Sequence, residues 1–464
     1  MSEPASGAIL GGAQMTDQVV VSFEGPGAGV GELTWGQQKV WTLMHEVDSS
    51  LSMGGAVPVT DGRTVQDLAA ELRFFMCRYA SMRARIRPGA EGDLIQEVWG
   101  SGETILGILD VADDADPDLA AQGLAKTWED TIFDYAEEWP IRMAAVRHRG
   151  AVTHVVVTIS HIATDGAGIA VMLGELSERD PITGEPKNPV PAMGPLELAQ
   201  LQRTPAGQRQ SEVSLRHWGR LLRAAEPRRF GPYVDRGEPR YRQAVFESRA
   251  LHLASKVVAA RVGGSASSVV LAGYAVAVAR LTGINPVLIQ VVVSNRFRPG
   301  LAEVSHPLSV NGLLMVDVAD ASFDEVVNRT QRASALCSKY AYYDPAQLKE
   351  LRAQVAQERG EAIDISCAFN DRRLDIGIEP PGAVPPREEI ESALADSVLR
   401  WDRPFSELAE KLMIQVGDVP DTVELLVLAD THHVSVDDVE AFVPDLESLV
   451  VAAALDPDTL GAGA

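Results

Sequence analysis

The stretch SHIATDGAG, residues 160–168, lies between two apolar runs of different character. The run before it, residues 151–160, is rich in valine, threonine and isoleucine, which favour β-strands. The run after it, IAVMLGEL at 169–176, indicates a buried helix. The quoted stretch is therefore predicted to be a turn from strand to helix, and such turns at the end of a sheet often carry reactive side chains.

The turn carries residues suited to acid–base chemistry. His161 can take a proton near neutral pH because an unperturbed imidazole has a pKa of about 6.5, and a well-placed general base accelerates a reaction about 10²–10⁴-fold. Asp165 would orient the ring or fix the turn through an arginine, and the backbone N–H groups of Gly166 and Gly168 would face a developing oxyanion. The alternative is structural: a hydrogen-bonded histidine at a sheet end, with Asp165 as the helix N-cap.

The composition is that of a globular protein with a sizeable core. The chain has 464 residues, of which 46% are hydrophobic and 23% charged, and this length suggests two or three domains. Its net charge of −24 argues against nucleic acid or an anionic membrane as partner, because both reward positive charge. No partner of either kind is expected.

The cysteines and the N-terminus indicate a reducing compartment. Three cysteines stand far apart and form no disulfide framework. The first 18 residues lack the basic and apolar regions of a signal peptide, and the most apolar run, residues 267–283, is interrupted by Arg280. A cytoplasmic location is therefore predicted.

Other chemical motifs are missing from the sequence. No nucleophile elbow, phosphate-binding loop or dinucleotide fingerprint occurs. The adjacent pair His432 and His433 does not predict a metal site, because neighbouring strand residues point to opposite faces. No metal and no bound cofactor are expected.

Periodicity divides the chain into two lobes that mix strands and helices. Helices are predicted over 33–44 and 65–79, the second with a capping-box-like start at Thr64 and Asp67. A buried helix should end at Gly283, and the last segment should form a helix or a helix pair interrupted at Pro444. The proposed division is a flexible tail at 1–18, a first lobe at 19–180, a linker and basic crossing segment at 181–240, and a second lobe at 241–464, with a surface loop at 379–386.

The crossing segment is rich in arginine in an otherwise acidic chain. The simpler interpretation is a solvated, salt-bridged segment. The functional alternative is a docking patch for an acidic partner. The arginines concerned are Arg216, Arg220, Arg223, Arg228, Arg229, Arg236, Arg240 and Arg242.

Taken in order, several segments resemble the condensation domains of nonribosomal peptide synthetases, which belong to the chloramphenicol-acetyltransferase-like acyltransferases. The turn resembles the family signature His-His-x-x-x-Asp-Gly, and the resemblance extends from about residue 20 to 455. The matching residues are Gln37 and Trp41 in TWGQQKVW, Arg78 and Arg83 in RYASMRARI, His161, Asp165 and Gly166 in the turn, Arg296 in VVVSNR, and Val310 and Asn311 in LSVNGLLMVDV.

The resemblance implies an α/β fold of two acetyltransferase-like lobes in a V-shaped pseudo-dimer with a central tunnel. It implies that His161 positions or deprotonates the acceptor and that the Gly166 N–H holds the oxyanion. Asp165 would make a structural salt bridge to Arg83 or Arg78. Ser160 and Asn311 would support the site. The donor would arrive as a thioester on the phosphopantetheine of a carrier protein or on coenzyme A.

Some family features are replaced. Ser160 stands where the first motif histidine is expected, and Tyr79 and Ala80 replace a His-Glu pair. With no adenylation or carrier segment in the sequence, the expected function is a stand-alone condensation enzyme that forms an amide or ester in nonribosomal peptide biosynthesis. Its carrier protein would dock in trans, with the basic segment between Arg216 and Arg242 as a candidate surface. The alternatives are an acyl-coenzyme A-dependent acyltransferase of a small-molecule acceptor and a degenerate domain that recruits a partner protein.

Overall fold

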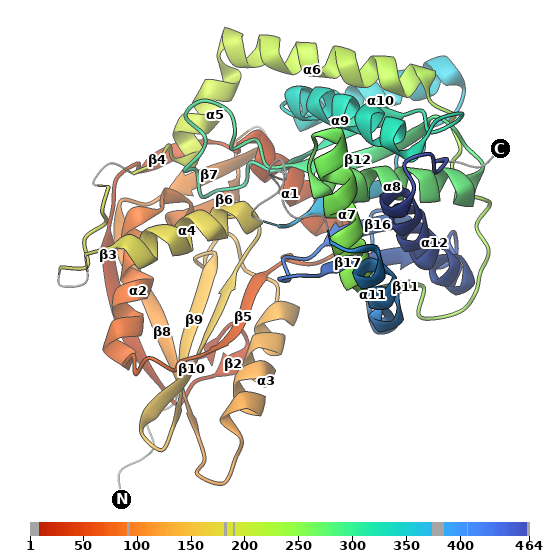
Figure 1. The fold of residues 1–464 in the computed structure, drawn as a ribbon. Helices are drawn as coiled ribbons and strands as arrows, with labels where there is room; N and C mark the ends of the chain where they lie inside the picture. The colour runs from red at the N-terminus through yellow and green to blue at the C-terminus, as the bar shows by residue number, and fades with distance from the viewer. Residues whose placement is uncertain are drawn as a thin grey trace, which may run out of the picture. The chain divides into compact units, whose positions relative to one another are not determined.

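The computed structural model describes residues 9–90, 93–180, 183–188, 191–373, 385–405 and 407–461. The chain forms two compact units (Figure 1). Unit 1 comprises Met1–Gln208 and Ser294–Ser309, and unit 2 comprises Arg209–Val293 and Val310–Ala464. This division differs from the predicted one, because the expected crossing segment 181–240 is split between the units and residues 294–309 belong to the first.

Unit 1 is built on a five-stranded sheet in the order β3-β8-β9-β10-β5, in which only β8 and β9 are parallel. A three-stranded sheet, β4-β7-β6, and a short hairpin, β1-β2, complete it. The strands are β1 (Ile9–Leu10), β2 (Ala13–Gln14), β3 (Asp17–Glu24), β4 (Gly29–Glu32), β5 (Met53–Pro58), β6 (Ala84–Pro88), β7 (Leu94–Val98), β8 (Ser101–Val111), β9 (Ile141–His148) and β10 (Ala151–Ile159).

Helices cover both faces of the five-stranded sheet, because its strands alternate their apolar side chains between two cores. On β9, Met143 and Ala145 face the core shared with α2, whereas Ala144 and Val146 face the core shared with α3. The helices of this unit are α1 (Trp35–Glu46), α2 (Val65–Arg78), the short 3-10 helix η1 (Ala80–Arg83), α3 (Pro117–Asp130), α4 (Gly166–Glu178) and α5 (Pro195–Arg203). The capping box of Thr64 and Asp67 predicted for α2 is confirmed.

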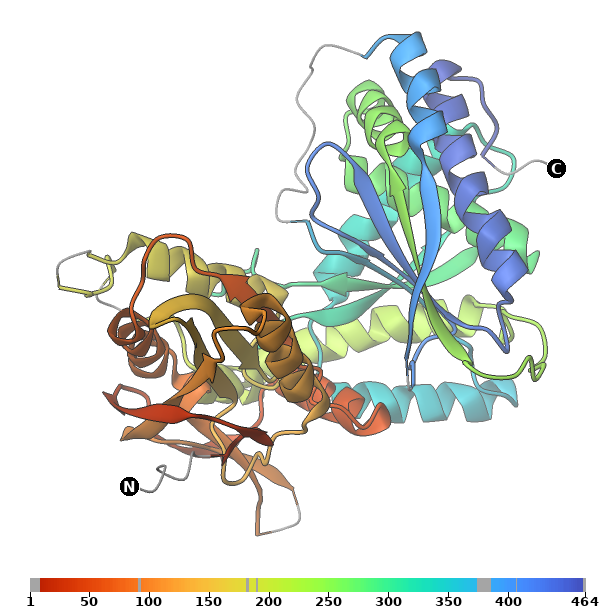
Figure 2. The ribbon, with the colours of Figure 1, turned by 90° about the horizontal axis from the view of Figure 1, so that it is seen from below.

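Unit 2 is built on a seven-stranded mixed sheet in the order β13-β12-β14-β16-β17-β11-β15. Its strands are β11 (Tyr241–Ser248), β12 (Val287–Val293), β13 (Val310–Val316), β14 (Cys367–Asp371), β15 (Val398–Phe405), β16 (Leu412–Val416) and β17 (Val423–Asp430). Figure 2 shows helix α12, in dark blue, alongside this sheet.

The helices of unit 2 surround one large apolar core. As predicted, Gly283 ends the buried helix α8 in a left-handed conformation. The predicted break at Pro444 is wrong, because α12 continues through it. The helices are α6 (Pro205–Ala224), which begins in unit 1, α7 (Arg249–Val262), α8 (Ala266–Thr282), α9 (Phe323–Tyr340), α10 (Pro345–Arg359), α11 (Arg387–Ala393), the short η2 (Leu394–Asp396) and α12 (Val436–Leu455).

The predicted flexible tail at residues 1–18 needs correction, and part of it and of the predicted surface loop lies outside the described residues. The expected tail is ordered from residue 9, because the β1-β2 hairpin packs on α3 and the Trp128 indole donates to the Leu10 carbonyl at 2.8 Å. Residues 1–8 of that tail, and residues 379–384 of the expected surface loop, lie outside the described residues.

No single helix of the described chain has the length and apolar composition needed to cross a membrane. Among the residues that the structure describes, one pair of helices, α7 and α8, bent by 105°, meets that test together, by length and composition alone. The cytoplasmic location stays a prediction.

Candidate active site

The turn that follows β10 is held by backbone hydrogen bonds within unit 1. The Ser160 N–H donates to the Pro140 carbonyl at 2.9 Å, and the His161 N–H donates to the Ser50 carbonyl at 3.3 Å. At the other end, the Asp165 carboxylate caps α4 by accepting the Gly168 N–H at 2.8 Å. The predicted strand-turn-helix is confirmed, and His161 lies at its start.

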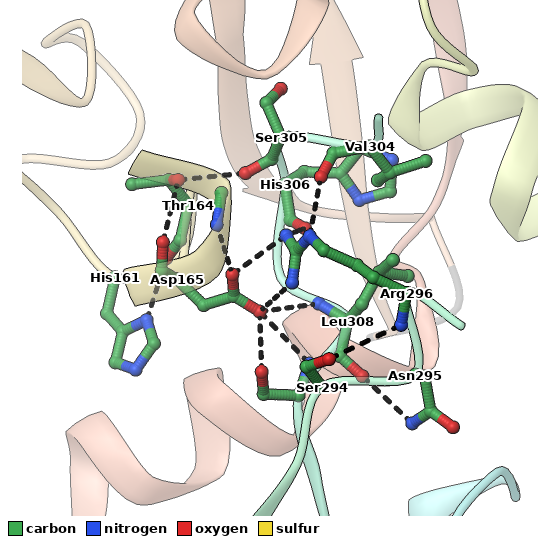
Figure 3. A network of polar contacts seen from close by, with 12 residues as sticks. His161, Thr164, Asp165, Ser294, Asn295, Arg296, Val304, Ser305, His306 and Leu308 are labelled. Atoms are coloured by element: carbon green, nitrogen blue, oxygen red, sulfur yellow. Dashed lines mark hydrogen bonds and ion pairs between the residues drawn. The ribbon is translucent and has the colours of Figure 1, made fainter. Parts of the chain in front are cut away.

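The His161 imidazole has a defined tautomer. Its Nδ1 lies 2.7 Å from the Thr164 carbonyl oxygen (Figure 3). Because a carbonyl only accepts, Nδ1 carries the proton, and Nε2 of the neutral ring keeps its lone pair. Burial lowers the pKa of His161 and the Lys39 cation adds to that effect, while the Thr164 carbonyl and Asp165 partly offset it. The ring is therefore neutral at pH 7 and able to accept a proton at Nε2.

Asp165 is a buried carboxylate whose two oxygens are fully occupied. The Arg296 guanidinium lies 2.8 Å from one oxygen and 3.1 Å from the other. One oxygen also accepts the backbone N–H groups of Leu308 and Ser309, both at 3.0 Å, and the Ser309 hydroxyl at 2.8 Å. Burial opposes ionisation, but Arg296 and the N–H donors outweigh it and lower the pKa of Asp165.

This geometry makes Asp165 a structural residue. Figure 3 shows its carboxylate directed toward Arg296 while the His161 ring points another way. With its lone pairs used by the cation, the backbone amides and a hydroxyl, Asp165 is suited to holding the turn and not to exchanging a proton. Asp165 is therefore both the N-cap of α4 and the partner of an arginine, as the sequence predicted.

The predicted partner of Asp165 is wrong. Arg78 instead pairs with Glu175 of α4 at 2.8 Å. Arg83 is fully buried and donates to the carbonyl oxygens of Gly25, Pro26 and Trp99. Arg78 ends α2 and Arg83 lies in η1, and each guanidinium group already has its own partners. The resemblance matched Arg296 to a family arginine but gave no reason to pair it with Asp165.

Residues 294–309 form the collar around Asp165. Arg296 is held in place by the carbonyls of Val304, at 3.0 Å, and His306, at 3.2 Å. The Thr164 hydroxyl donates to the Ser305 carbonyl at 2.8 Å. A β-carbon on Gly168 would lie 2.0 Å from that same carbonyl oxygen, so only glycine permits this approach. The collar comes from a segment that lies between β12 and β13 in sequence, yet it belongs to unit 1.

His306 of the collar is buried as a neutral imidazole. Burial and the Arg296 cation lower its pKa to about 4, and Asp165 partly offsets this. The carbonyls of Met193 and Pro307 lie near the ring, although neither ring nitrogen makes a hydrogen bond of normal geometry with the part of the chain that the structure describes.

The titration of His306 predicts a loss of stability in mild acid. The unfolded chain binds a proton at His306 near pH 6.5, whereas the folded chain does so only near pH 4. The contribution of His306 to the free energy of unfolding is therefore fully present above pH 6.5. It is lost as the pH falls from 6.5 to 4, by roughly 3 kcal/mol in total. Urea denaturation from pH 7 to pH 4.5 should show a shallower decline in His306→Leu than in the wild type, with the partly exposed His148→Leu as control. Parallel declines in all three proteins would contradict this assignment.

The other predicted site residues lie in different elements of the chain, each with its own contacts. Gly166 is the exposed first residue of α4, where backbone N–H groups have no acceptor within the helix. Ser160 is fully buried at the end of β10. Asn311 lies in β13 of unit 2, where its side chain donates to Gln290 at 3.0 Å and its carbonyl accepts the Tyr343 hydroxyl at 2.6 Å. Tyr79, which replaces the family histidine, donates to Glu175 at 2.6 Å.

The arginine-rich segment is salt-bridged in part, since three of its eight arginines pair with acidic residues in the described chain. Arg223, Arg228 and Arg240 pair with Glu358, Glu361 and Asp430, respectively. Arg229 and Arg236 donate to backbone carbonyls, and Arg242 lies over the Trp401 ring. Arg216 and Arg220 are exposed on α6. No cluster of possible metal ligands occurs among the residues that the structure describes.

Comparison with known proteins shows the family. The model of the condensation domain family matches residues 28–379. The chain therefore belongs to the condensation domain family, as the sequence predicted. The AMB antimetabolite synthetase AmbB of Pseudomonas aeruginosa is 24% identical over 282 residues. That alignment covers 59% of this chain and 22% of AmbB, so the chain spans about a fifth of that relative.

Solved structures agree in fold. The SgcC5 protein of Streptomyces globisporus is 18% identical, with a TM-score of 0.68 over 93% of this chain and 100% of that one. The X-domain from teicoplanin biosynthesis is 17% identical, with a TM-score of 0.69 over 93% of this chain and 96% of that one. The predicted α/β fold of the chloramphenicol-acetyltransferase-like type is confirmed, while the V shape and central tunnel stay predictions.

Proposed function

We propose that this chain is an acyltransferase that joins an acyl group, delivered as a thioester, to an amine or hydroxyl acceptor. The observation that carries this proposal is the 2.7 Å contact of His161 Nδ1 with the Thr164 carbonyl, which leaves Nε2 as the free base of a neutral ring. Membership of the condensation domain family supports the reaction class.

In the proposed reaction, His161 Nε2 takes the proton of the acceptor as its nitrogen or oxygen attacks the thioester carbonyl. The new C–N or C–O bond forms, and the carbonyl oxygen gains negative charge that the Gly166 N–H stabilises. The C–S bond then breaks, and the departing thiolate recovers the proton from the imidazolium. Asp165 and Arg296 take no proton in this scheme, because they hold the turn.

The donor distinguishes two versions of this activity. A phosphopantetheine arm on a carrier protein and coenzyme A end in the same thiol, so His161 chemistry serves both. We favour the carrier protein, because the family and the synthetase AmbB point to nonribosomal peptide biosynthesis. Alcohol acceptors are included because the SgcC5 structure holds (R)-(-)-1-(2-naphthyl)-1,2-ethanediol, which carries two hydroxyl groups.

The test is product formation measured by mass spectrometry. One acyl group is offered on a phosphopantetheinyl carrier and on coenzyme A, each with a pool of amines and alcohols, to the wild type and to His161→Ala. Product from the carrier alone, lost in the variant, is the expected result. Product from coenzyme A would assign a small-molecule acyltransferase. Equal product with and without His161 would remove the base assignment.

A second candidate is recruitment of a partner protein without catalysis. The teicoplanin X-domain, which shares the fold, has also been solved in complex with OxyB. Replacement of the first motif histidine by Ser160 and of the family His-Glu pair by Tyr79 and Ala80 favours this candidate, whereas the intact geometry of His161 and Asp165 opposes it. A biological function preserved in His161→Ala would favour recruitment.

If an acidic carrier docks on the basic segment, reversing its exposed charges should slow the reaction. In Arg216→Glu/Arg220→Glu, turnover of the carrier-bound donor is expected to fall about tenfold and to lose its salt dependence, since steering by opposite charge is screened by salt. These two arginines are chosen because neither makes an ion pair with an acidic residue of the described chain, unlike Arg223 and Arg228.

The matched control reverses Arg73 and Lys256, which are exposed on α2 and α7 and make no ion pair with an acidic residue of the described chain. This pair changes the net charge by the same amount as the test variant. Turnover should then stay near that of the wild type, and the coenzyme A donor should be unaffected in both variants. Unchanged turnover and salt dependence in the arginine variant would exclude the docking role.

A further inference from the structure

A chain of hydroxyl groups lies behind His161. Ser160, its neighbour in sequence, is fully buried, and its hydroxyl donates to the Tyr135 hydroxyl at 3.3 Å. The Tyr135 hydroxyl in turn donates to Ser50 Oγ at 2.6 Å. Ser50 is also buried, so the two serines depend on Tyr135 for part of their hydrogen bonding.

Ser50 connects this chain to the backbone of His161. Its Oγ also accepts the Phe133 N–H at 3.0 Å, and its carbonyl accepts the His161 N–H at 3.3 Å. The hydroxyl chain therefore joins three segments: the end of β10, the loop between α1 and β5, and the segment between α3 and β9. All three belong to unit 1.

Tyr135 is itself firmly placed. Its ring packs edge-on against Trp41 of α1, with 5.3 Å between ring centroids. Its carbonyl accepts the Ile86 N–H at 2.8 Å. Burial raises the pKa of Tyr135, so the phenol stays protonated and remains a donor at neutral pH.

We propose that Tyr135 is a positioning residue for His161, because its hydroxyl bridges Ser160 and Ser50 and so fixes the loop that accepts the His161 N–H. In this chain the hydroxyl of Ser160 takes the position that a histidine has in the family motif, and Tyr135 serves as its partner. The functional consequence rests on the proposed role of His161 as the base.

The test follows the imidazole of His161 directly and needs no substrate. Histidine labelled with ¹³C in the ring is incorporated, His161 is assigned with His161→Gln, and its signal is titrated by NMR in four proteins: the wild type, Tyr135→Phe, Ser160→Ala and the double variant. Besides the Thr164 carbonyl, the charged groups that influence the ring are Asp165 and Lys39. Neither is changed in these variants.

In the wild type, His161 should titrate below the 6.5 of a solvated imidazole, because burial lowers its pKa. Tyr135→Phe leaves both serines short of a partner and loosens the loop, so water reaches the ring and the pKa rises toward about 6.5. Ser160→Ala is the milder change and should give a smaller rise. The double variant should recover part of the wild-type value, since it removes two matched hydroxyls together.

The control is Tyr274→Phe, which removes another buried phenol, one that contacts Cys367 and the Leu412 carbonyl in unit 2. It should lower the melting temperature without moving the His161 titration. A wild-type titration in both Tyr135→Phe and Ser160→Ala would overturn the proposal. Failure of the proposed role of His161 in acyl transfer would be recognised separately, because product formation would then be equal with and without His161, whatever the titration gives.

Discussion

Replacing Asp165 by alanine is expected to lower the free energy of unfolding by about 3–5 kcal/mol. The substitution leaves the Arg296 guanidinium, whose side chain is 9% exposed, without its counter-ion. It also removes the acceptor of the Leu308 and Ser309 amides and the N-cap of α4. Chemical denaturation at pH 7 measures this loss.

A double-mutant cycle identifies the partner of Asp165. Asp165→Ala and Arg296→Ala should be strongly non-additive, because each removes the same buried pair. Asp165→Ala and Arg78→Ala should add to within about 0.5 kcal/mol, since Arg78 pairs with Glu175. Coupling of Asp165 to Arg78 but not to Arg296 would contradict the structure described above.

The same carboxylate predicts a limit in acid. The pKa of Asp165 is lowered in the folded chain. Its contribution to stability is therefore fully present above the unfolded value of about 3.9 and is lost only as the pH falls through the lower folded value. Acid unfolding between pH 6.5 and 4 must then come from other groups, His306 among them.

Replacing His161 by alanine is expected to lower turnover about 10²–10⁴-fold, the usual contribution of a general base. The Michaelis constants should change little, because the side chain acts on the proton in transit and not on the bound acyl group. The measurement is steady-state kinetics with the donor that gives product. His148→Ala, whose ring lies near the Asp113 carbonyl, is the control and should keep wild-type kinetics.

The pH profile tests the protonation state of His161. Because burial lowers the pKa of His161 below that of a solvated imidazole, kcat/KM should hold at neutral pH and fall only at pH values below about 6.5. A profile that falls already above pH 7 would contradict a neutral, half-buried imidazole as the base. Wild-type turnover in His161→Ala would remove the assignment altogether.

Much of unit 1 was predictable because its signals are local. The valine-rich run before residue 160 and the apolar run after residue 168 predicted β10 and α4, since periodicity and β-propensity act over neighbouring residues. The Thr64 capping box predicted the start of α2 for the same reason. At Pro444 a local rule failed, because α12 is held by the core of unit 2 strongly enough to tolerate a proline.

The partner of Asp165 was not predictable by the same means. Arg78 and Arg83 are nearer in sequence than Arg296, and all three matched family motifs. Spacing along the chain carries no information about which guanidinium is already occupied. The backbone carbonyls at residues 25, 26 and 99 hold Arg83, and that arrangement exists only after the strands and loops of unit 1 have assembled.

The sequence by itself determined the family, the strand-turn-helix at residues 160–168, and the presence of His161, Asp165 and Gly166 within one turn. The tertiary structure decided the environment of each. It brought residues 294–309 into unit 1, so that Arg296 pairs with Asp165 although 131 positions separate them in the sequence. It also placed the Tyr135 hydroxyl beside that of Ser160. The physical reason is that a motif fixes which groups are near in sequence, whereas burial and pairing depend on segments that meet only in the folded chain.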